Sequence, residues 1–359
     1  MKKRNSAFDI LKIFLSIFVV LYHQYLHQGS VFNENFSQFD SWIFSIFSVV
    51  IASPVPIFIL ISAYLATISS KQDLRGFFKF GIDTFLYWVI CVILVIIFVS
   101  GLNVDISISR TLTFGGRDWW YLWSFLIIKS ISPILVHGIK NVNKLVSLTG
   151  IIFLLFMRFA FIKSNNNELF NAGTIIGFLS VYLVGIWMTF FLKEQIKNKS
   201  VIKASIIVCF TFVVFSFIFK IMQFWIDFNI SKLLGFDSPM TPFPVIFSIF
   251  VFILITNVYI EEKKFINLIA KTLLPVYLFH FIFEIIMNQF IWSKVFKNSN
   301  SLGLYELNFF IALITWLITE AFALLIMYPH GFVSKYLNIS LWATIHFINQ
   351  KYKKILVKS

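Results

Sequence analysis

The sequence predicts an all-α fold, a polytopic membrane helical bundle of about ten transmembrane helices. Of its 359 residues, 59% are hydrophobic and only 13% are charged, whereas a soluble globular protein keeps about a quarter of its residues charged. Too little polar surface remains to cover a water-soluble globule, and long apolar stretches recur along the whole chain. Cys91 and Cys209 both lie in apolar runs, so we expect neither a disulfide framework nor a metal site.

Ten stretches are long enough for a membrane-spanning helix, which takes about 17–25 residues. They cover approximately residues 10–28, 43–68, 80–100, 119–136, 145–163, 172–192, 202–222, 242–260, 268–290 and 306–328. The first stretch is too long for a signal peptide and lacks a small-residue cleavage site. No connecting segment has room for a catalytic domain. We therefore expect one transmembrane unit over residues 1–337, and an interfacial helix with a basic cytoplasmic tail over residues 338–359.

The basic residues set the expected orientation of these spans. Lys and Arg concentrate in alternate segments, which are the N-terminus, residues 71–79, 140–144, 193–203 and 263–271, and the C-terminal tail. By the positive-inside rule both termini are predicted to be cytoplasmic. Topology and attraction to membrane lipid then account for the net charge of +14. No folded basic domain is left to bind nucleic acid. Abundant Phe, Ile, Lys and Asn are typical of an AT-rich bacterial genome, so we expect the multi-pass protein in a bacterial inner or cytoplasmic membrane.

A polar stripe interrupts the first span. Asp9, Lys12, Ser16, His23 and His27 recur at a spacing that places them on one face of a helix. A charge at the centre of a membrane helix costs about 2.5–3.5 kcal/mol, so the stripe is expected to face the bundle interior or a wet cavity. His23 lies about 17 Å further along the axis than Lys12. This arrangement suits an anionic cytoplasmic donor whose reactive end reaches an imidazole that transfers protons near neutral pH.

A blander interpretation of the stripe stays open. Lys12 can snorkel to the membrane surface, and His23 can hydrogen-bond another helix without taking part in chemistry. Asp9 either orients Lys12 as an i, i+3 pair or is a solvated charge at the helix end.

Four segments, in order, resemble the acyltransferase-3 family of integral membrane acyltransferases. The first is RNSAFDILKIFLSIFVVLYH (4–23), similar to the family's Asp, Leu-Arg or Leu-Lys, ten mostly apolar residues and His. The others are VPIFILISAYL (55–65), WWYLWSFLIIKSISPIL (119–135) and LPVYLFHFIF (274–283), with His280 in the place of a late histidine. The likeness covers essentially the whole chain.

The resemblance implies a ten-helix bundle that moves an acyl group, usually acetyl, from cytoplasmic acyl-CoA to a sugar hydroxyl. The acceptor is then a lipid-linked sugar or a glycan of the cell surface or for export. Acetyl-CoA is a donor substrate, and no cofactor is bound permanently. His23 takes the place of the essential histidine and Lys12 that of the basic residue before it. Where the family commonly has two arginines, this chain has Arg75 and Lys79.

These considerations give roles to the candidate residues. His23 is the expected general base, assisted by Lys12 and Asp9, although an acyl-histidine intermediate is an open alternative. Lys12, Arg75 and Lys79 are expected to bind the phosphates of CoA.

A second stripe, on the ninth span, holds His280 and Glu284. It either borders the acceptor site, fixes the tautomer of His23, or forms an interhelical hydrogen bond that holds the bundle together. His27 and Trp120 are further candidates for contact with the acceptor, although Trp120 also suits an interfacial belt.

Three other buried charges invite structural explanations. We expect Arg158 and Glu320 to form an ion pair, and Lys129 to neutralise a buried carboxylate.

Two other functions compete with acyl transfer. A lipid-linked oligosaccharide flippase or transporter is also a basic many-helix bundle, but its expected symmetric broken helices are missing from the proline pattern. A glycan polymerase of the same pathway normally carries a large outer loop, which this sequence lacks. The sequence leaves the oligomeric state open.

Overall fold

The computed structural model describes residues 5–31, 49–69, 75–98, 120–161, 172–226, 239–287 and 304–356, and within these ranges the secondary structure is helical with no strand. The helices are α1 (Ser6–Val31), α3 (Pro54–Ile68), α4 (Arg75–Phe98), α6 (Trp120–Asn141), α7 (Lys144–Phe161), α8 (Ala172–Phe191), α9 (Lys193–Ile196), α10 (Lys199–Ile226), α12 (Pro242–Thr256), α13 (Lys264–Ile269), α14 (Leu273–Met287) and α16 (Leu304–Leu356). The predicted all-α class is confirmed.

Five of the described helices, α1, α4, α6, α10 and α16, are long and apolar enough to cross a membrane. The shorter apolar helices α3, α8, α12 and α14 accompany them. The chain is therefore a multi-pass membrane protein by composition and helix length. The number of about ten crossings and the cytoplasmic side of the termini stay predictions.

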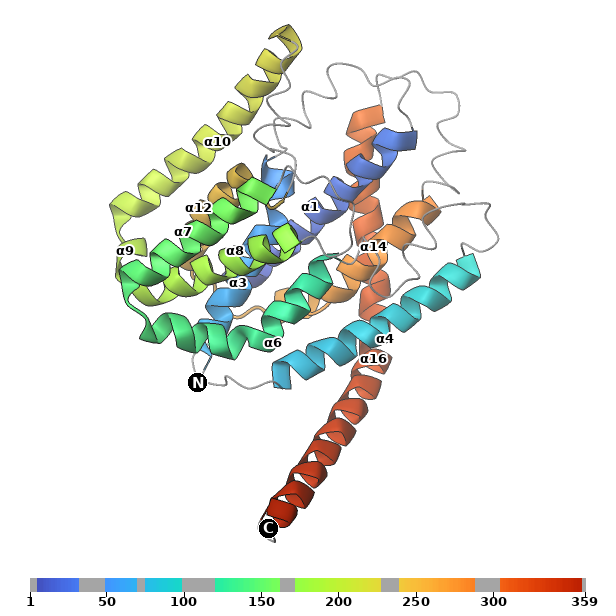
Figure 1. The fold of residues 1–359 in the computed structure, drawn as a ribbon. Coiled ribbons are helices and arrows are strands. Elements are labelled where there is room, and N and C mark those ends of the chain that lie inside the picture. The colour runs from blue at the N-terminus through green and yellow to red at the C-terminus, as the bar shows by residue number, and fades with distance from the viewer. Residues whose placement is uncertain are drawn as a thin grey trace.

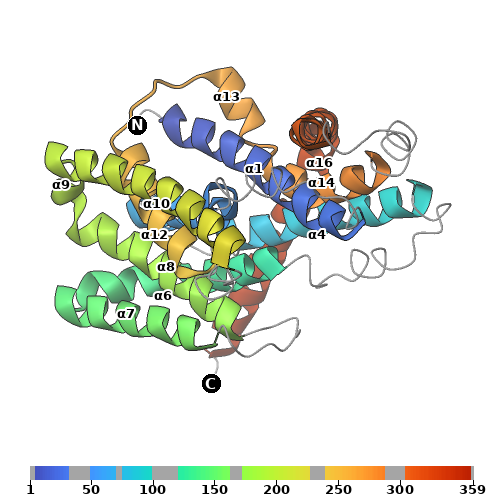
Figure 2. The ribbon, with the colours of Figure 1, turned by 90° about the horizontal axis from the view of Figure 1, so that it is seen from above.

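The helices pack in two groups that share α1 (Figures 1 and 2). In the first group α3 and α8 lie at the centre, and α6, α7 and α12 pack around them. In the second group α16 contacts α1, α14 and α4. Because α1 also contacts α3 and α12, it joins the two groups. Asp9 and Ser16 of its polar stripe are buried inside the bundle.

Helices α3 and α8 cross closely because a glycine of α8 lies at the crossing. A Cβ added at Gly185 in α8 would lie 2.7 Å from the Cβ of Ala63 in α3, so no larger residue fits there without a shift of the helices. Small residues at helix crossings let membrane helices approach each other and gain dispersion energy. Gly185 and Ala63 thus set the central packing of the first group.

The start of α1 is held by the segment that links α12 to α13. The side-chain oxygen of Asn5 accepts hydrogen bonds from the backbone N–H groups of Ala7 and Ile260, each at 3.0 Å. Its amide donates to the carbonyl of Val258 at 2.8 Å. Ser6 extends this junction through its side chain, which donates to Asn267 at 3.2 Å. These bonds satisfy groups that a helix N-terminus leaves open and fix where α1 enters the bundle.

One helix, α16, is far longer than a membrane is thick. It runs without interruption from Leu304 to Leu356 and contains Pro329. Figure 1 shows its C-terminal part projecting beyond the other helices. Residues 338–356 belong to this same helix, so no helix boundary separates the two units predicted from the sequence. The interfacial position of this segment and its basic tail stays a prediction.

Candidate active site

The first turns of α1 carry a buried ion pair. The ammonium of Lys12 lies 3.3 Å from Oδ1 of Asp9, and the Asp9 side chain is almost fully buried while that of Lys12 is partly exposed. The structure therefore agrees with the interpretation in which Asp9 pairs with Lys12 at i, i+3, and not with a solvated charge at the helix end. Further along the same face, Ser16 accepts a hydrogen bond of 2.9 Å from the indole N–H of Trp316 in α16.

A cavity of about 1000 Å³ opens beside this ion pair. Its walls come from the beginning of α1, the ends of α3, α8 and α12, and the short helix α9. Its polar and charged lining residues include Asp9, Lys12, Lys193, Lys197 and Asn257, and Tyr64 and Phe252 add aromatic surface. The lining residues lie in segments that the positive-inside rule assigns to the cytoplasmic side. The cavity therefore combines several cations with apolar and aromatic walls.

Of the two predicted phosphate-binding residues whose side chains the structure describes, Lys12 and Lys79, one lines this cavity. Lys12 does, whereas Lys79 is exposed on α4 and is not among the described residues of the wall. Arg75 begins α4, and its side chain lies outside the described residues. Lys193 and Lys197 were missed as site residues, because the sequence analysis used them only to orient the membrane spans. Lys193 begins α9 and Lys197 directly follows it, and their spacing of one helical turn was the available signal.

About three turns beyond Lys12, His23 meets His280. Their ring centroids lie 4.9 Å apart, and the planes are tilted by 52°. The pairing joins α1 to α14, and it follows from the direct contact of these two helices. Tyr277 lies against His280 with a centroid distance of 5.9 Å, and Tyr121 of α6 lies 5.1 Å from Tyr277. The two histidines that the sequence placed on separate stripes thus belong to one cluster.

The ring of His280 is held in place by its own helix. Its Nδ1 lies 2.7 Å from the carbonyl oxygen of Tyr277 and 3.2 Å from that of Val276. The side chain is only 4% exposed. Since a carbonyl oxygen can only accept, these contacts assign the N–H to Nδ1 and leave Nε2 as the acceptor of the neutral ring.

One turn after His280, Glu284 is buried in the same face of α14. It is 1% exposed, and neither carboxyl oxygen has a hydrogen-bond partner among the described residues. A buried polar group normally has a partner, so each exception calls for an explanation. A bound ligand with hydroxyl groups would provide hydrogen-bond partners for these two oxygens.

The two remaining residues predicted to contact the acceptor are Trp120 and His27. Trp120 is half-buried at the start of α6 and packs edge-on against Phe178 of α8. Its ring contacts within the described residues are with Phe178 and Tyr121 and not with the histidine pair. The side chain of His27 lies outside the described residues.

Two structural expectations are wrong. Arg158 and Glu320 form no ion pair in the described part of the chain. Arg158 packs against Gly177 of α8, where a Cβ would lie 3.1 Å from its Cδ and Nε atoms, and Glu320 accepts a hydrogen bond from Thr272 instead. Helical periodicity predicted that both charges are deep, but it does not say which helices are neighbours.

Lys129 likewise has no carboxylate at ion-pair distance within the described ranges. Its ammonium lies over the ring of Phe125, 5.8 Å from the centroid. A cation over an aromatic face is favourable in a site with little water. This contact takes the place of the predicted carboxylate.

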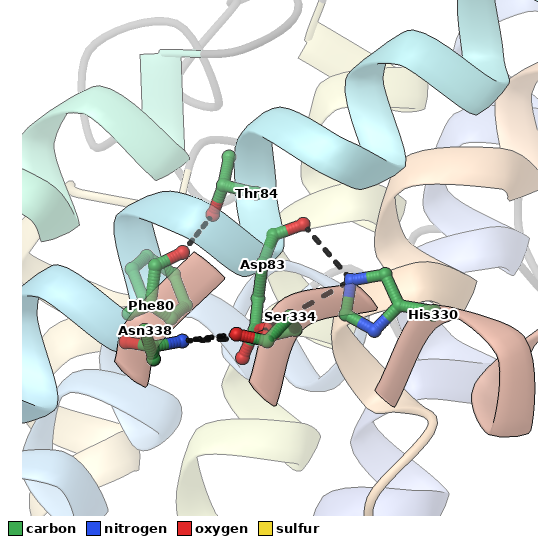
Figure 3. Close-up of polar contacts among 6 residues, drawn as sticks. All are labelled: Phe80, Asp83, Thr84, His330, Ser334 and Asn338. Atoms are coloured by element: carbon green, nitrogen blue, oxygen red, sulfur yellow. Dashed lines mark hydrogen bonds and ion pairs between the residues drawn. The ribbon is translucent and has the colours of Figure 1, made fainter. Parts of the chain in front are cut away.

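A separate polar cluster joins α4 to α16 (Figure 3). Asp83 accepts a hydrogen bond from the hydroxyl of Ser334, and its Oδ1 lies 3.9 Å from Nε2 of His330. Asn338 donates to the hydroxyl of Ser334 at 3.3 Å. The His330 ring also stacks on Tyr87, with the ring centroids 3.7 Å apart. The sequence alone predicted no role for these residues. The cluster fixes α16 to α4 where α16 leaves the bundle.

Comparison with known proteins adds one finding. A family model, Acyl_transf_3, described as an acyltransferase domain, matches residues 5–328, which is nearly the whole chain. No curated protein and no solved structure matches the chain. The matched range includes α1, the cavity walls and both histidines.

Proposed function

Because the chain belongs to the acyltransferase-3 family, we propose that it is a membrane-bound O-acyltransferase that moves an acetyl group from cytoplasmic acetyl-CoA to a hydroxyl of a cell-surface or exported polysaccharide. Family membership supports the acyltransferase class. The donor, the acceptor and the residues named below are the proposal.

The arrangement along α1 is the observation that carries this proposal. At one end of a single helix face, Lys12 lines a cationic cavity, and eleven residues further on His23 lies beside His280. Eleven residues of α-helix span about 17 Å. An extended phosphopantetheine arm covers a distance of that order. The phosphates can then remain at the cavity while the thioester reaches the imidazoles.

The cavity suits the charged half of acyl-CoA. Lys12, Lys193 and Lys197 offer three ammonium groups to its phosphates, and the aromatic walls offer surface to the adenine. The ion pair with Asp9 holds the Lys12 side chain in the mouth of the cavity. Lys12 is therefore a donor-binding residue, and Asp9 positions it.

The reaction at the far end uses His23 as general base. Its imidazole takes the proton of the acceptor hydroxyl while the oxygen attacks the thioester carbonyl carbon. The tetrahedral intermediate collapses with cleavage of the C–S bond, and the imidazolium returns the proton to the departing thiolate. The products are an O-acetyl ester and CoA thiol. An acyl-histidine route balances in the same way over two steps.

The surroundings of Glu284 support the proposal that the acceptor carries hydroxyl groups. Its two buried carboxyl oxygens have no hydrogen-bond partner in the described residues and lie one helical turn from His280. Sugar hydroxyls donate readily to carboxyl oxygens. We place the acceptor against this part of α14.

The test compares His23→Ala with His137→Ala at matched expression. His137 is exposed on α6 and bonds only Asn141 among the contacts given for it, so it is a matched control for the loss of a histidine. Membranes receive labelled acetyl-CoA and polysaccharide extracted from the host cells, and ester-linked acetate is measured. We expect the His23 variant to lose at least about 100-fold of the transfer rate, and the control to retain it.

Two outcomes contradict the proposal. If the His23→Ala variant transfers acetyl at the wild-type rate, His23 is not the general base. A loss of surface polysaccharide, in place of intact polysaccharide without acetate, favours a flippase or polymerase.

A further inference from the structure

We infer that Asn257 selects the nucleobase of the donor: the oxygen of its side-chain amide accepts a hydrogen bond from the exocyclic amino group of adenine at the cavity wall. The inference rests on the proposed function, because it concerns the nucleotide end of the same acyl-CoA. It names the class of base that this part of the wall distinguishes, which is a purine that carries an amino group in place of a carbonyl oxygen.

The orientation of the Asn257 amide is fixed by two backbone carbonyls. Asn257 caps the end of α12 and lines the cavity. Its Nδ2 donates to the carbonyl of Ile196 in α9 at 3.1 Å and to the carbonyl of Ile253 in its own helix at 2.8 Å. Because a carbonyl oxygen only accepts, both N–H groups of the amide are used. The Oδ1 atom points away from these carbonyls and has no hydrogen-bond partner among the described residues.

The other asparagine of the cavity wall has no acceptor to spare. The Oδ1 atom of Asn5 already accepts from the backbone N–H groups of Ala7 and Ile260, each at 3.0 Å. A carbonyl oxygen has two lone pairs, and these two bonds occupy both. Of the two amide oxygens in the wall, a ligand with an N–H donor therefore finds its acceptor at Asn257.

The helix that ends in Asn257 also carries part of an aromatic surface. Phe252 of α12 meets Tyr64 of α3 edge-on at a centroid distance of 5.9 Å, and Phe8 of α1 stacks on Tyr64 at 5.4 Å. All three rings line the cavity. A purine packed on them can bring its edge to the Asn257 amide. There an amino N–H is attracted to Oδ1, whereas a carbonyl oxygen is repelled.

This arrangement uses half of a known pairing. Asparagine reads adenine in DNA by accepting from its amino group and donating to the neighbouring ring nitrogen. The backbone of α9 and α12 takes up the donors of Asn257, so only the acceptor half remains. A site built to accept a hydrogen bond binds an analogue without the donor less well, because its acceptor then loses a partner.

The test compares CoA with a CoA analogue in which purine replaces adenine, so that only the exocyclic amino group is missing. Dissociation constants are measured by calorimetry with the purified full-length protein in detergent. We expect the wild type to bind CoA about 10-fold more tightly than the analogue. The two compounds have the same phosphates and the same ring system. A change in packing or in the lysines therefore alters both constants together and leaves their ratio.

Two substitutions of nearly equal size separate the acceptor from the tie to α9. Asn257→Asp keeps acceptor oxygens but loses the N–H groups, and its charge weakens the binding of both compounds alike. We expect it to retain the preference within about 3-fold. Asn257→Leu also removes the acceptor and is expected to bring the ratio to about 1. Asn141→Leu, on an exposed residue outside the described cavity wall, is the control and is expected to keep the wild-type ratio.

The outcomes distinguish this inference from the proposed function. Equal constants for the two compounds in the wild type, or an undiminished preference in Asn257→Leu, overturn the inference and leave the proposed donor site standing. Loss of the preference in Asn257→Asp as well assigns it to the tie with α9 and also overturns the inference. If neither compound binds the wild type, the proposed donor site is wrong and the inference falls with it.

Discussion

At the scale of single residues, the buried polar side chains His280 and Glu284 are the most relevant to the proposed chemistry. His23 of α1 lies beside His280 of α14, and Glu284 follows one turn later on α14. Buried polar groups of this kind are costly to keep in a membrane helix and are functional candidates for that reason.

Glu284 provides a prediction about the acceptor. Glu284→Gln keeps the shape of the side chain but weakens its bonds to hydroxyl groups, because hydrogen bonds to an ionised or ionisable oxygen are the stronger ones. We expect the KM for host polysaccharide to rise about 10-fold, with the KM for acetyl-CoA unchanged. Glu261→Gln, on an exposed residue, is the control. A lower unfolding midpoint with an unchanged acceptor KM would instead assign Glu284 to the packing of the bundle.

The helix periodicity of the sequence predicted much at this scale. It placed Lys12 and His23 on one face of α1, and His280 and Glu284 on one face of α14. It did not bring the two faces together, because the partner of a helix is chosen by side-chain packing over the whole bundle and not by spacing within one helix. The same limit explains the wrong pairing of Arg158 with Glu320.

At the scale of elements, the short helix α9 is the least expected part of the candidate site. It begins at Lys193, separated from the end of α8 by one residue, and both Lys193 and Lys197, which directly follows α9, line the cavity. From sequence these residues were a topology signal only, since a basic segment at a membrane surface has that role by default. Their place in a cavity wall depends on the ends of α3 and α12, which are distant in the chain.

Replacement of Lys193 and Lys197 tests their role in donor binding. We expect Lys193→Gln with Lys197→Gln to raise the KM for acetyl-CoA about 10-fold and to leave kcat within about 2-fold, because two charges facing the phosphates are lost while the base is intact. Added salt is expected to weaken donor binding in the wild type more than in this variant.

Lys203→Gln, an exposed lysine of α10 outside the described cavity wall, is the matched control for charge. An unchanged KM in the double variant would show that the donor phosphates bind elsewhere, for example at Arg75.

At the scale of the whole molecule, α16 connects regions that are far apart. Along its length it donates from Trp316 to Ser16 of α1, accepts at Glu320 from Thr272 just before α14, and contacts Asp83 of α4 through Ser334. The fold class and the helix positions were predictable from composition and apolar length. The continuity of α16 past residue 337 was not, because the last apolar stretch ends near residue 328 and the more polar residues 338–359 were expected to form a separate interfacial helix.

The cluster around Asp83 is expected to contribute to the stability of the whole bundle (Figure 3). Asp83→Ala removes the acceptor of the buried Ser334 hydroxyl and the carboxylate beside His330, while the contact of His330 with the backbone carbonyl of residue 83 remains. Leaving a buried donor without its acceptor costs about 1–3 kcal/mol. We expect a lower midpoint of thermal unfolding in detergent. Lys335→Ala, on the exposed side of the same turn, is expected to leave the midpoint unchanged. An equal effect of the two substitutions would refute the contribution of the cluster.

The uninterrupted helix from Leu304 to Leu356 also has a practical use. Anchored at three levels inside the protein, it leaves the bundle as a stiff rod. A globular marker fused to residue 356 through a continuous helical linker would keep a defined direction relative to the membrane spans. Particles of a small protein hidden in a detergent micelle could then be aligned by electron cryomicroscopy on a landmark outside the micelle.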